Sequence, residues 1–274
     1  MTINCRGKLL DLSKPIVMGV LNVTPDSFSD GGKYTETEKA LVQAEKMLRE
    51  GATIIDIGGM SSRPNAKNIS SEEEINRVLP IVEKLAARFP EIVISIDTIY
   101  AQTADISLKN GASIINDISG GDFDKKMLEV VAKHRAPFVI MHMRGTPEIM
   151  QSLTDYDNVT KEVFNDLCEK QARCKQSGIT DVIIDVGFGF AKTTEQNFQL
   201  LKQLSVFKTL DAPILAGLSR KSMITKTLNI KAAEALNGTS VLNTVALLNG
   251  ANILRVHDVK EAVEAVRLTE ELKK

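Results

Sequence analysis

The chain has 274 residues, with 34 Lys and Arg against 35 Asp and Glu, so its formal net charge at pH 7 is -1. Hydrophobic residues make up 43% and charged residues 25%, a balance that argues against disordered, collagen-like and membrane-embedded proteins and provides enough apolar side chains for a large core. The near-neutral charge gives no overall attraction to nucleic acid or to an anionic membrane, so an anionic ligand needs a local group of cations.

The N-terminus and the cysteines indicate a cytoplasmic protein. The opening residues, MTINCRGK, lack the basic and then apolar order of a signal peptide, and no apolar stretch is long enough to span a bilayer. The three cysteines, Cys5, Cys168 and Cys174, form no C-x-x-C pair and are odd in number. That pattern argues against a disulfide framework and favours reduced thiols.

Short apolar runs, each followed by a polar break and a helical pattern, recur eight times. The runs begin at Pro15, Ala52, Ile92, Ala112, Pro137, Asp181, Pro213 and Ala251. Apolar runs without alternation are typical of parallel strands covered on both faces. Eight such units without a linker predict a single (β/α)₈ barrel domain over residues 1–274, with a doubly wound open sheet as the alternative. Residues 1–14 form an N-terminal extension, which we expect to be a hairpin across the barrel bottom.

Helix signals between the runs agree with this arrangement. Ser71 with Glu74 three residues later predicts a capping box for a helix over residues 72–89. A helix over residues 232–249 carries more apolar side chains than one buried face requires. We therefore expect the second helix to pack against a partner chain in a homodimer.

Polar residues follow nearly every apolar run, at the end of a barrel where active sites lie. They are Asn22, Asp56, Asp97, Asn116–Asp117, His142, Asp185, Ser219–Lys221, Arg255 and His257. A single Asn or Asp in this place is often only a turn or cap residue. Amides, carboxylates, an imidazole and cations at so many strand ends together indicate a binding funnel.

Two kinds of ligand chemistry are suggested by this funnel. Its cations suit a phosphate or diphosphate, unless they form an ordinary solvated surface cluster. They are Arg63, Arg220, Lys221, Arg255 and His257. The carboxylates Asp97 and Asp185, with Asn116 between them, suit a flat heterocycle of amidine type, although an ion pair with one of the cations is the alternative.

Two long Gly- and Ser-rich segments, 22–34 and 58–70, interrupt the short loops expected of a barrel. We expect them to act as lids that exclude water from the site. The three histidines show no metal-ligand spacing, so a tightly held zinc is not indicated. A Mg²⁺ ion that arrives with a phosphate would leave almost no trace in the sequence.

The most specific segments are MGVLNVTPDSFSDGG at 18–32 and GLSRKS at 217–222, supported by IDIGGMSSRP, SIDT, INDISGG, MHMRGTP, DVGFGFAKT and LRVHD. On these motifs the chain resembles, from about Val17 to Val266, the dihydropteroate synthase family of pterin-binding barrels, which are targets of sulfonamides. The resemblance implies a homodimeric transferase of folate biosynthesis. It would condense (7,8-dihydropterin-6-yl)methyl diphosphate with 4-aminobenzoate to give 7,8-dihydropteroate and diphosphate, with Mg²⁺ as cofactor.

The resemblance also assigns roles to residues at matching positions. It implies that the pterin is held by Asp97, Asn116, Asp185 and Lys221, with Arg255 stacked on its face. It implies that the diphosphate is held by Ser62, Arg63, Arg255 and His257, and Mg²⁺ by Asn22. The pocket for 4-aminobenzoate would be lined by Phe28, Pro64, Phe190, Ser222 and the stem of Lys221. The catalytic set would be Lys221, Arg255, His257, Asp97 and Asp185.

Departures from the usual family pattern occur at Met60, Ser62, Asn65 and Val186, and the first of these puts the geometry of the second lid in question. Three alternatives stay open. A pterin-binding methyltransfer domain and a non-catalytic pterin-binding paralogue share much of the pattern. A class I aldolase would use Lys221 as a Schiff-base lysine, helped by Arg220.

Overall fold

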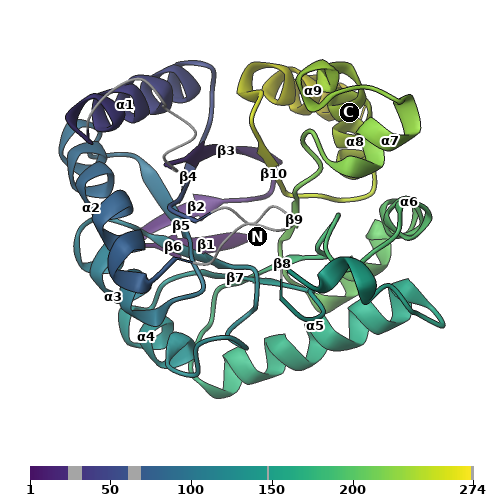
Figure 1. Ribbon diagram of the computed structural model, residues 1–274, viewed down its shortest axis with the longest axis horizontal. Helices are drawn as coiled ribbons and strands as arrows, with labels where there is room; N and C mark the ends of the chain where they lie inside the picture. Colours follow the sequence, from purple (N-terminus) through teal and green to yellow (C-terminus); the bar gives the residue numbers. More distant parts are fainter. Residues whose placement is uncertain (24–32, 61–68, 147, 273–274) are drawn as a thin grey trace.

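The computed structural model describes residues 1–23, 33–60, 69–146 and 148–272, with the backbone alone described at 33–36. Eight parallel strands form a closed barrel, because the last strand pairs with the first barrel strand (Figure 1). They are β3 (Ile16–Asn22), β4 (Ile54–Gly58), β5 (Val93–Asp97), β6 (Ile114–Asp117), β7 (Phe138–Met141), β8 (Val182–Asp185), β9 (Ile214–Ala216) and β10 (Ile253–Val256). The closure confirms the predicted (β/α)₈ barrel and excludes the open sheet.

Helices surround the barrel on its outside (Figure 1). They are α1 (Lys33–Arg49), α2 (Ser71–Arg88), α3 (Ala101–Lys109), α4 (Met127–His134), α5 (Val159–Gln176), α6 (Thr194–Lys202), α7 (Ser222–Leu228), α8 (Leu236–Leu248) and α9 (Val259–Glu271), with 3₁₀ turns η2 (Met150–Ser152), η3 (Leu204–Leu210) and η4 (Ala232–Glu234). Among the described residues, no helix is both long and apolar enough to cross a membrane.

Two helix predictions need correction at their ends. The cap of α2 is Ser70, whose hydroxyl accepts a hydrogen bond from Glu73 N at 3.2 Å, one residue before the predicted capping box. Glu74 instead lies on the buried face and accepts a hydrogen bond from the Thr98 hydroxyl. The helix predicted over 232–249 is divided, because the Glu234 side chain accepts from Lys231 N at 3.0 Å and closes a separate turn before α8.

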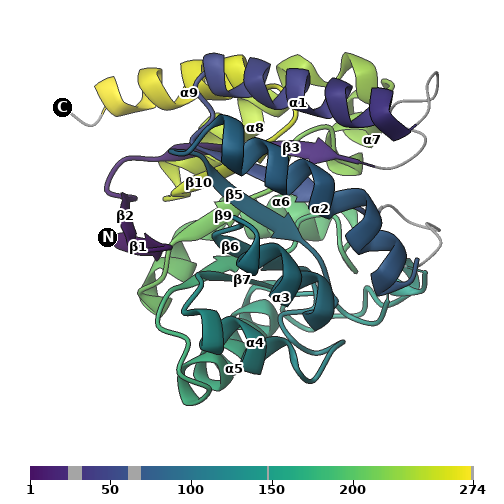
Figure 2. The ribbon, with the colours of Figure 1, turned by 90° about the vertical axis from the view of Figure 1, so that its left-hand side faces the viewer.

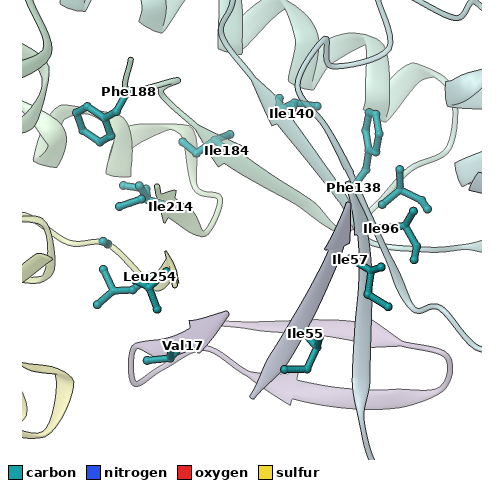
Figure 3. Packing of buried hydrophobic residues seen from close by; sticks show 14 of the residues in the cluster. Val17, Ile55, Ile57, Ile96, Phe138, Ile140, Ile184, Phe188, Ile214 and Leu254 are labelled. Carbon is teal, nitrogen blue, oxygen red and sulfur yellow. The ribbon is translucent and has the colours of Figure 1, made fainter. Parts of the chain in front are cut away.

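Side chains along each barrel strand alternate between two buried environments. On β4, Ile55 and Ile57 face outward into the core between barrel and helices, whereas Ile54 faces the barrel interior. Figure 3 shows the outer core, in which Val17, Leu254 and other strand residues extend toward the helices. Strands apolar on both faces produce the unbroken Val- and Ile-rich runs of the sequence.

The barrel interior begins with an apolar layer near the start of the strands. Each strand contributes one side chain: Met18, Ile54, Val93, Ile114, Val139, Ile183, Leu215 and Ile253. The antiparallel strands β1 (Thr2–Cys5) and β2 (Lys8–Asp11) add Ile3 and Cys5 to this cluster. Figure 2 shows this hairpin at the end of the barrel where the strands begin. The hairpin therefore closes that end, and a ligand can only approach from the other.

Candidate active site

The next interior layer is polar. Since side chains alternate, the residue two positions after each member of the apolar layer faces the same interior, nearer the strand ends. These residues are Val20, Asp56, Ser95, Asn116, Met141, Asp185, Gly217 and Arg255. Carboxylates, an amide and a guanidinium thus replace the isoleucines and valines of the layer below, which places the polar funnel predicted from the sequence at the C-terminal end of the barrel.

Arg255 is the centre of a hydrogen-bonded network that joins this layer to Asp97, two residues farther along β5. Its Nε donates to Asp56 Oδ2 and its Nη2 to Asp97 Oδ2, both at 2.6 Å. Asn116 Nδ2 donates to the same Asp56 oxygen at 3.1 Å. The network joins strands from both ends of the chain, so Asp97, Asn116 and Arg255, which the sequence singled out, do lie together.

Asp56 is a site residue to which sequence analysis gave no role. It is fully buried, and its second carboxylate oxygen, Oδ1, has no hydrogen-bond partner in the described structure. A buried acceptor without a partner is costly, and a ligand N–H can satisfy it. The sequence had placed Asp56 among the polar residues of the funnel, and its position within the apolar run ATIIDIGG, two residues after Ile54, was the signal that could have assigned it a binding role.

The charges and the burial around Arg255 affect the protonation of Asp97 and of Arg255 itself. Burial raises the pKa of Asp97 to about 7, and the nearby Asp56 carboxylate adds to the rise, while the positive charge of Arg255 opposes it. For Arg255 itself, the two carboxylates outweigh the effect of burial and raise the pKa, so the guanidinium stays charged. Asp97 can therefore change its protonation state near neutral pH.

Asp185 and Lys221 form the opposite side of the funnel. Asp185 is buried and accepts a hydrogen bond from Gly187 N at 2.8 Å. Lys221 Nζ donates to the Phe188 carbonyl and lies 4.8 Å from the centre of the Phe190 ring. Burial lowers the pKa of Lys221 to about 8, although the charge of Asp185 opposes this shift. At neutral pH the Lys221 side chain is therefore mostly charged and acts as a hydrogen-bond donor.

The predicted group of cations is divided by the structure. Arg220 points to Asp258, to which its guanidinium donates two hydrogen bonds at 3.0 and 2.5 Å. Arg255 is engaged with carboxylates, as described above, so the ion-pair alternative holds for Asp97. His257 lies at the rim, where its Nδ1 is 3.0 Å from the Ser219 hydroxyl. Arg63 lies outside the described residues.

The remaining predicted residues are placed as follows. Phe190 is nearly buried, in an apolar cluster with Ile99, Ile118 and Met141. Ser222 is exposed at the start of α7. Met60 packs against the same cluster as Phe190, and Val186 is buried in the outer core. Phe28, Ser62, Pro64 and Asn65, and most of both predicted lids, fall outside the residues that the structure describes.

The end of β3 can contribute to a divalent cation site. A Cβ atom placed on Gly58 would lie 3.6 Å from Asn22 Oδ1 and 3.8 Å from Asp97 Oδ2, so an amide oxygen and a carboxylate oxygen face one small space. Oxygen donors suit Mg²⁺, which commonly takes its other ligands from water and substrate phosphates. Within the described residues no group of three or more His, Cys, Asp or Glu could hold a metal unaided. The donors present therefore fit an ion bound together with its substrate.

Two glycines leave room for a ligand between these groups. Gly58 ends β4 beside Asn22 and Asp97, and a Cβ on Gly217 would lie 3.8 Å from Lys221 Nζ and 3.9 Å from Asp185 Oδ2. Near these two glycines lie the acceptors Asn22 Oδ1, Asp97 Oδ2 and Asp185 Oδ2, and the ammonium of Lys221. This arrangement suits a flat ligand rich in N–H donors, such as an aminated heterocycle.

Comparison with known proteins agrees with this geometry. Residues 18–257 match the family of pterin binding enzymes. The chain is 47% identical to the dihydropteroate synthase of Escherichia coli K12, over 98% of this chain and 96% of that protein. A Yersinia pestis dihydropteroate synthase in complex with a sulfonamide drug superposes with a TM-score of 0.94 at 43% identity, covering 100% of this chain and 99% of that one.

A further solved structure is that of the Xanthomonas albilineans dihydropteroate synthase in complex with 7,8-dihydropteroate. It is 36% identical to this chain, with a TM-score of 0.90, and the alignment covers 100% of this chain and 99% of that one. These matches confirm the resemblance drawn from the motifs and favour the synthase over the methyltransfer and aldolase alternatives. The chain therefore belongs to the dihydropteroate synthase family of pterin-binding enzymes.

Proposed function

We propose that the polar layer at the strand ends is where this dihydropteroate synthase condenses (7,8-dihydropterin-6-yl)methyl diphosphate with 4-aminobenzoate. The observation that carries this proposal is the network of Arg255 with Asp56, Asp97 and Asn116, which leaves a buried carboxylate oxygen without a partner. The ring N–H and amino groups of a pterin are the donors that such acceptors lack. The family membership supports the same substrate.

The pterin is assigned to the interior of the funnel. Asp97, Asn116 and Asp185 would bind its N–H groups and ring nitrogens, Lys221 would donate to a ring acceptor, and the Arg255 guanidinium would stack on its face. To this set, which the resemblance implied, the structure adds Asp56 through its free Oδ1. Because the Arg255 and Asn116 contacts fix the Asp56 carboxylate, little reorganisation is needed when the ring binds.

The second substrate is assigned to the side of the funnel near Lys221. Phe190 and the aliphatic stem of Lys221 would contact the ring of 4-aminobenzoate, and Ser222, at the start of α7, would bind near its carboxylate. Phe28 and Pro64, which lie outside the described residues, would complete the proposed pocket. A solved structure of the Xanthomonas albilineans enzyme carries 4-aminobenzoic acid, which supports a separate pocket for this ligand.

The diphosphate is assigned to the rim. Ser62, Arg63, Arg255 and His257 would bind its oxygens, and the contact with Ser219 orients the His257 ring. Asn22 would hold Mg²⁺, which when bound supplies positive charge to the leaving diphosphate. Because Arg255 is already paired with two carboxylates, we expect His257 to carry more of the anion contact than the sequence alone suggested.

The reaction needs a stable leaving group and an electrophile protected from water. The bond between the exocyclic methylene carbon and the diphosphate oxygen breaks, and its electron pair leaves with the diphosphate. The amine of 4-aminobenzoate then forms the new C–N bond and loses a proton. Asp97 and Asp185 lie beside the ring on which positive charge develops, and their fixed charges lower the barrier. A neutral aromatic amine is nucleophilic enough without a strong general base.

The decisive experiment measures diphosphate release when both substrates are mixed with the protein and Mg²⁺. We expect release that depends on both substrates, with 7,8-dihydropteroate as the product. Pterin binding without release would instead indicate a non-catalytic paralogue. Borohydride trapping of a substrate carbonyl on Lys221 would indicate an aldolase.

Binding order provides a second test. We expect Mg²⁺ and the pterin diphosphate to bind first, on the hypothesis that the cationic rim and the predicted lids form the 4-aminobenzoate pocket only when the charge of the diphosphate is present. Calorimetry should show 4-aminobenzoate binding only after diphosphate and a pterin have been added. Equally tight binding to the unliganded protein would contradict this order.

Sulfonamides are proposed as inhibitors, because they are arylamines that mimic 4-aminobenzoate, and the Yersinia pestis relative binds such a drug. A sulfonamide should raise the apparent KM for 4-aminobenzoate and leave kcat unchanged. A change in kcat alone would place the drug elsewhere.

A homodimer is proposed through α8 and α9. Val241 and Leu248 on α8 and Leu268 on the neighbouring α9 are more than half exposed, although they are large apolar residues. Sedimentation of Val241→Glu should give a monomer where the parent gives a dimer. Val42→Glu, at a similarly exposed valine on α1, is the matched control and should leave the dimer intact.

We further propose that the chain forms a single domain and that the protein is cytoplasmic. The hairpin shares the interior cluster of the barrel, which supports one domain over residues 1–274.

The cysteines at 5, 168 and 174 are all free thiols, which favours the reducing cytoplasm.

A further inference from the structure

The loop that follows β8, residues 187–191, has an unusual backbone. Gly187, Gly189 and Ala191 all have positive φ angles, of 70°, 82° and 50°. A left-handed conformation costs a residue with a side chain about 1–2 kcal/mol. Of the three residues only Ala191 carries this cost, so contacts around the loop must offset the strain at Ala191.

Side chains from other parts of the chain provide those contacts, since each of the five loop carbonyls accepts a hydrogen bond from a side chain. The donors are Lys192 to Gly187 and Phe190, Lys221 to Phe188, Gln151 to Gly189, and Tyr156 to Ala191. On the other side, Asn197 Oδ1 accepts from Gly189 N at 2.7 Å. Lys192 is the donor that holds two of the five carbonyls.

The ammonium of Lys192 is buried at the centre of the loop, with only 4% of the residue exposed. Its Nζ lies 2.9 Å from Gly187 O, from Phe190 O and from His142 Nδ1. Burial lowers the pKa of Lys192, although the charge of Asp185 opposes this shift. The charged form has three N–H donors, which match the three acceptors around it. Burial and neighbouring cations lower the pKa of His142 to about 2, so its ring is neutral and Nδ1 can accept.

This loop contacts the side of the site that Asp185 and Lys221 form, and Lys192 is buried against the loop. Phe188 O accepts from Lys221, the Phe190 ring lies 4.8 Å from the same ammonium, and Gly187 N donates to Asp185. The loop thus sets the distance between the aromatic ring and the cation. Asp97, Asn116 and Arg255 lie on other strands and have no contact with it in the described hydrogen bonds.

We propose that Lys192 is a positioning residue: it clamps the 187–191 loop through two carbonyls and His142, and so places Phe190 and Lys221 for 4-aminobenzoate. This proposal rests on the assignment of that pocket under the proposed function. Sequence analysis missed Lys192 because it follows the strand by seven residues, where a lysine ordinarily faces solvent.

The test compares Lys192→Met with Lys170→Met. Both lysines are buried, and Lys170 Nζ also makes three close polar contacts: Met141 O at 2.8 Å, Asp166 at 3.1 Å and Asp122 at 3.5 Å. Lys170 lies on α5, and its described contacts include Met141 O, next to His142, but none of the residues 187–191. It therefore reproduces the loss of stability without the loss of positioning.

For Lys192→Met we expect the KM for 4-aminobenzoate to rise about tenfold or more and kcat to fall, because small displacements of positioning groups have large kinetic effects. The KM for the pterin diphosphate should change by less than about threefold, since most of its ligands lie on other strands. Lys170→Met should change neither KM. Equal effects of the two substitutions, or an equal rise in both KM values for Lys192→Met, would overturn the proposal.

Hydrogen exchange of the segment 186–193 gives a second measurement that needs no activity. Lys192→Met should speed the exchange of its amides about tenfold relative to Lys170→Met, since local opening becomes easier. Unchanged exchange would refute the clamp. Failure of the parent protein to form dihydropteroate, with faster exchange in Lys192→Met, would refute the proposed function and leave the clamp standing.

If Lys192→Met does not fold, His142 offers a milder change. His142→Leu removes one of the three acceptors, and His142→Asn keeps an acceptor near the position of Nδ1. The KM for 4-aminobenzoate should rise severalfold in the first variant and return to within about twofold of the parent in the second. A similar KM in both variants would contradict the role of this contact.

Discussion

Two layers inside the same barrel, two residues apart on the same strands, use burial in opposite ways. The lower layer consists of apolar side chains, each of which gains about 1.5–3 kcal/mol when it leaves water. The upper layer buries carboxylates and a guanidinium, whose removal from water is costly and is offset only by their mutual contacts. One face of a strand can therefore provide stability at one position and chemistry two residues later.

The largest expected effect is at Lys221. Lys221→Ala should lower diphosphate release by about a thousandfold, because it removes a donor to the pterin and one wall of the second pocket. Lys221→Arg should also lower diphosphate release, because the planar guanidinium cannot take the place of a compact ammonium at the end of a narrow aliphatic chain. The melting temperatures should stay near that of the parent.

The control for Lys221 is Lys226→Ala, which changes an exposed lysine on the following helix. Its diphosphate release should equal that of the parent. Preserved release in either Lys221 variant would remove this residue from the site and weaken the distinction between the two layers.

A pair of substitutions on β8 tests the comparison directly. Ile183→Ala, in the lower layer, should cost about 2–5 kcal/mol of unfolding free energy and leave kcat/KM of the folded enzyme unchanged. Asp185→Asn, two residues later, should lower kcat/KM about tenfold or more and leave stability nearly unchanged. Denaturant unfolding and steady-state rates measure both, and a loss of stability and activity together in each variant would show that the layers are not separable.

The pH profile of kcat/KM sharpens the description of the upper layer. Burial raises the pKa of Asp97 to about 7, so its carboxylate becomes protonated and the rate falls as the pH decreases below 7. Burial lowers the pKa of Lys221 to about 8, so its ammonium is lost and the rate falls as the pH rises above 8. We expect a narrow bell with a roughly tenfold decrease per pH unit on each side. Asp97→Asn should abolish the acidic limb alone, and a limb that persists would assign it to another group.

The smallest effect is expected far from both layers. Arg135, exposed at the end of α4, has a positive φ of 51°. Arg135→Gly should therefore stabilise the protein by up to about 1 kcal/mol, since glycine adopts this conformation without strain. Lys133→Gly, inside the same helix, should destabilise it by about the same amount. Neither substitution should alter kcat/KM. A changed kcat/KM would show that the stability of α4 affects the active site.

The sequence predicted the barrel and the end that carries the site, because parallel strands buried on both faces have unbroken apolar runs. It also located Asp97, Asn116, Asp185 and Arg255 at that end. It could not show that Arg255 pairs with Asp56 and Asp97, because register across a closed barrel is not visible in one strand. Asp56 was also located at that end, and its position two residues beyond the interior Ile54 would have assigned it a binding role.

Other assignments failed for local reasons. Ser70 and Ser71 are equally good caps by composition, and only the burial of Glu74 against Thr98 decides between them. Arg220 was grouped with the anion-binding cations, but Asp258 from the next unit reaches it first. Lys192 could not be assigned a role, because that role depends on the positive φ angles at every second residue of the 187–191 loop, which the sequence does not reveal. For Glu74 and Arg220 the missing information was a contact distant in sequence, and for Lys192 it was the local backbone conformation.

The position of Arg255 on the last strand has a consequence for how the protein is made. Asp56 and Asp97 precede it by 199 and 158 residues, so at about 5–20 residues per second they leave the ribosome roughly 10–40 s before their partner. Until then, neither carboxylate can be buried beside its guanidinium, and a growing chain keeps the upper end of the unfinished barrel open to water. Pairing of β10 with β3 and neutralisation of the site are thus one late step, and no incomplete chain can retain a substrate.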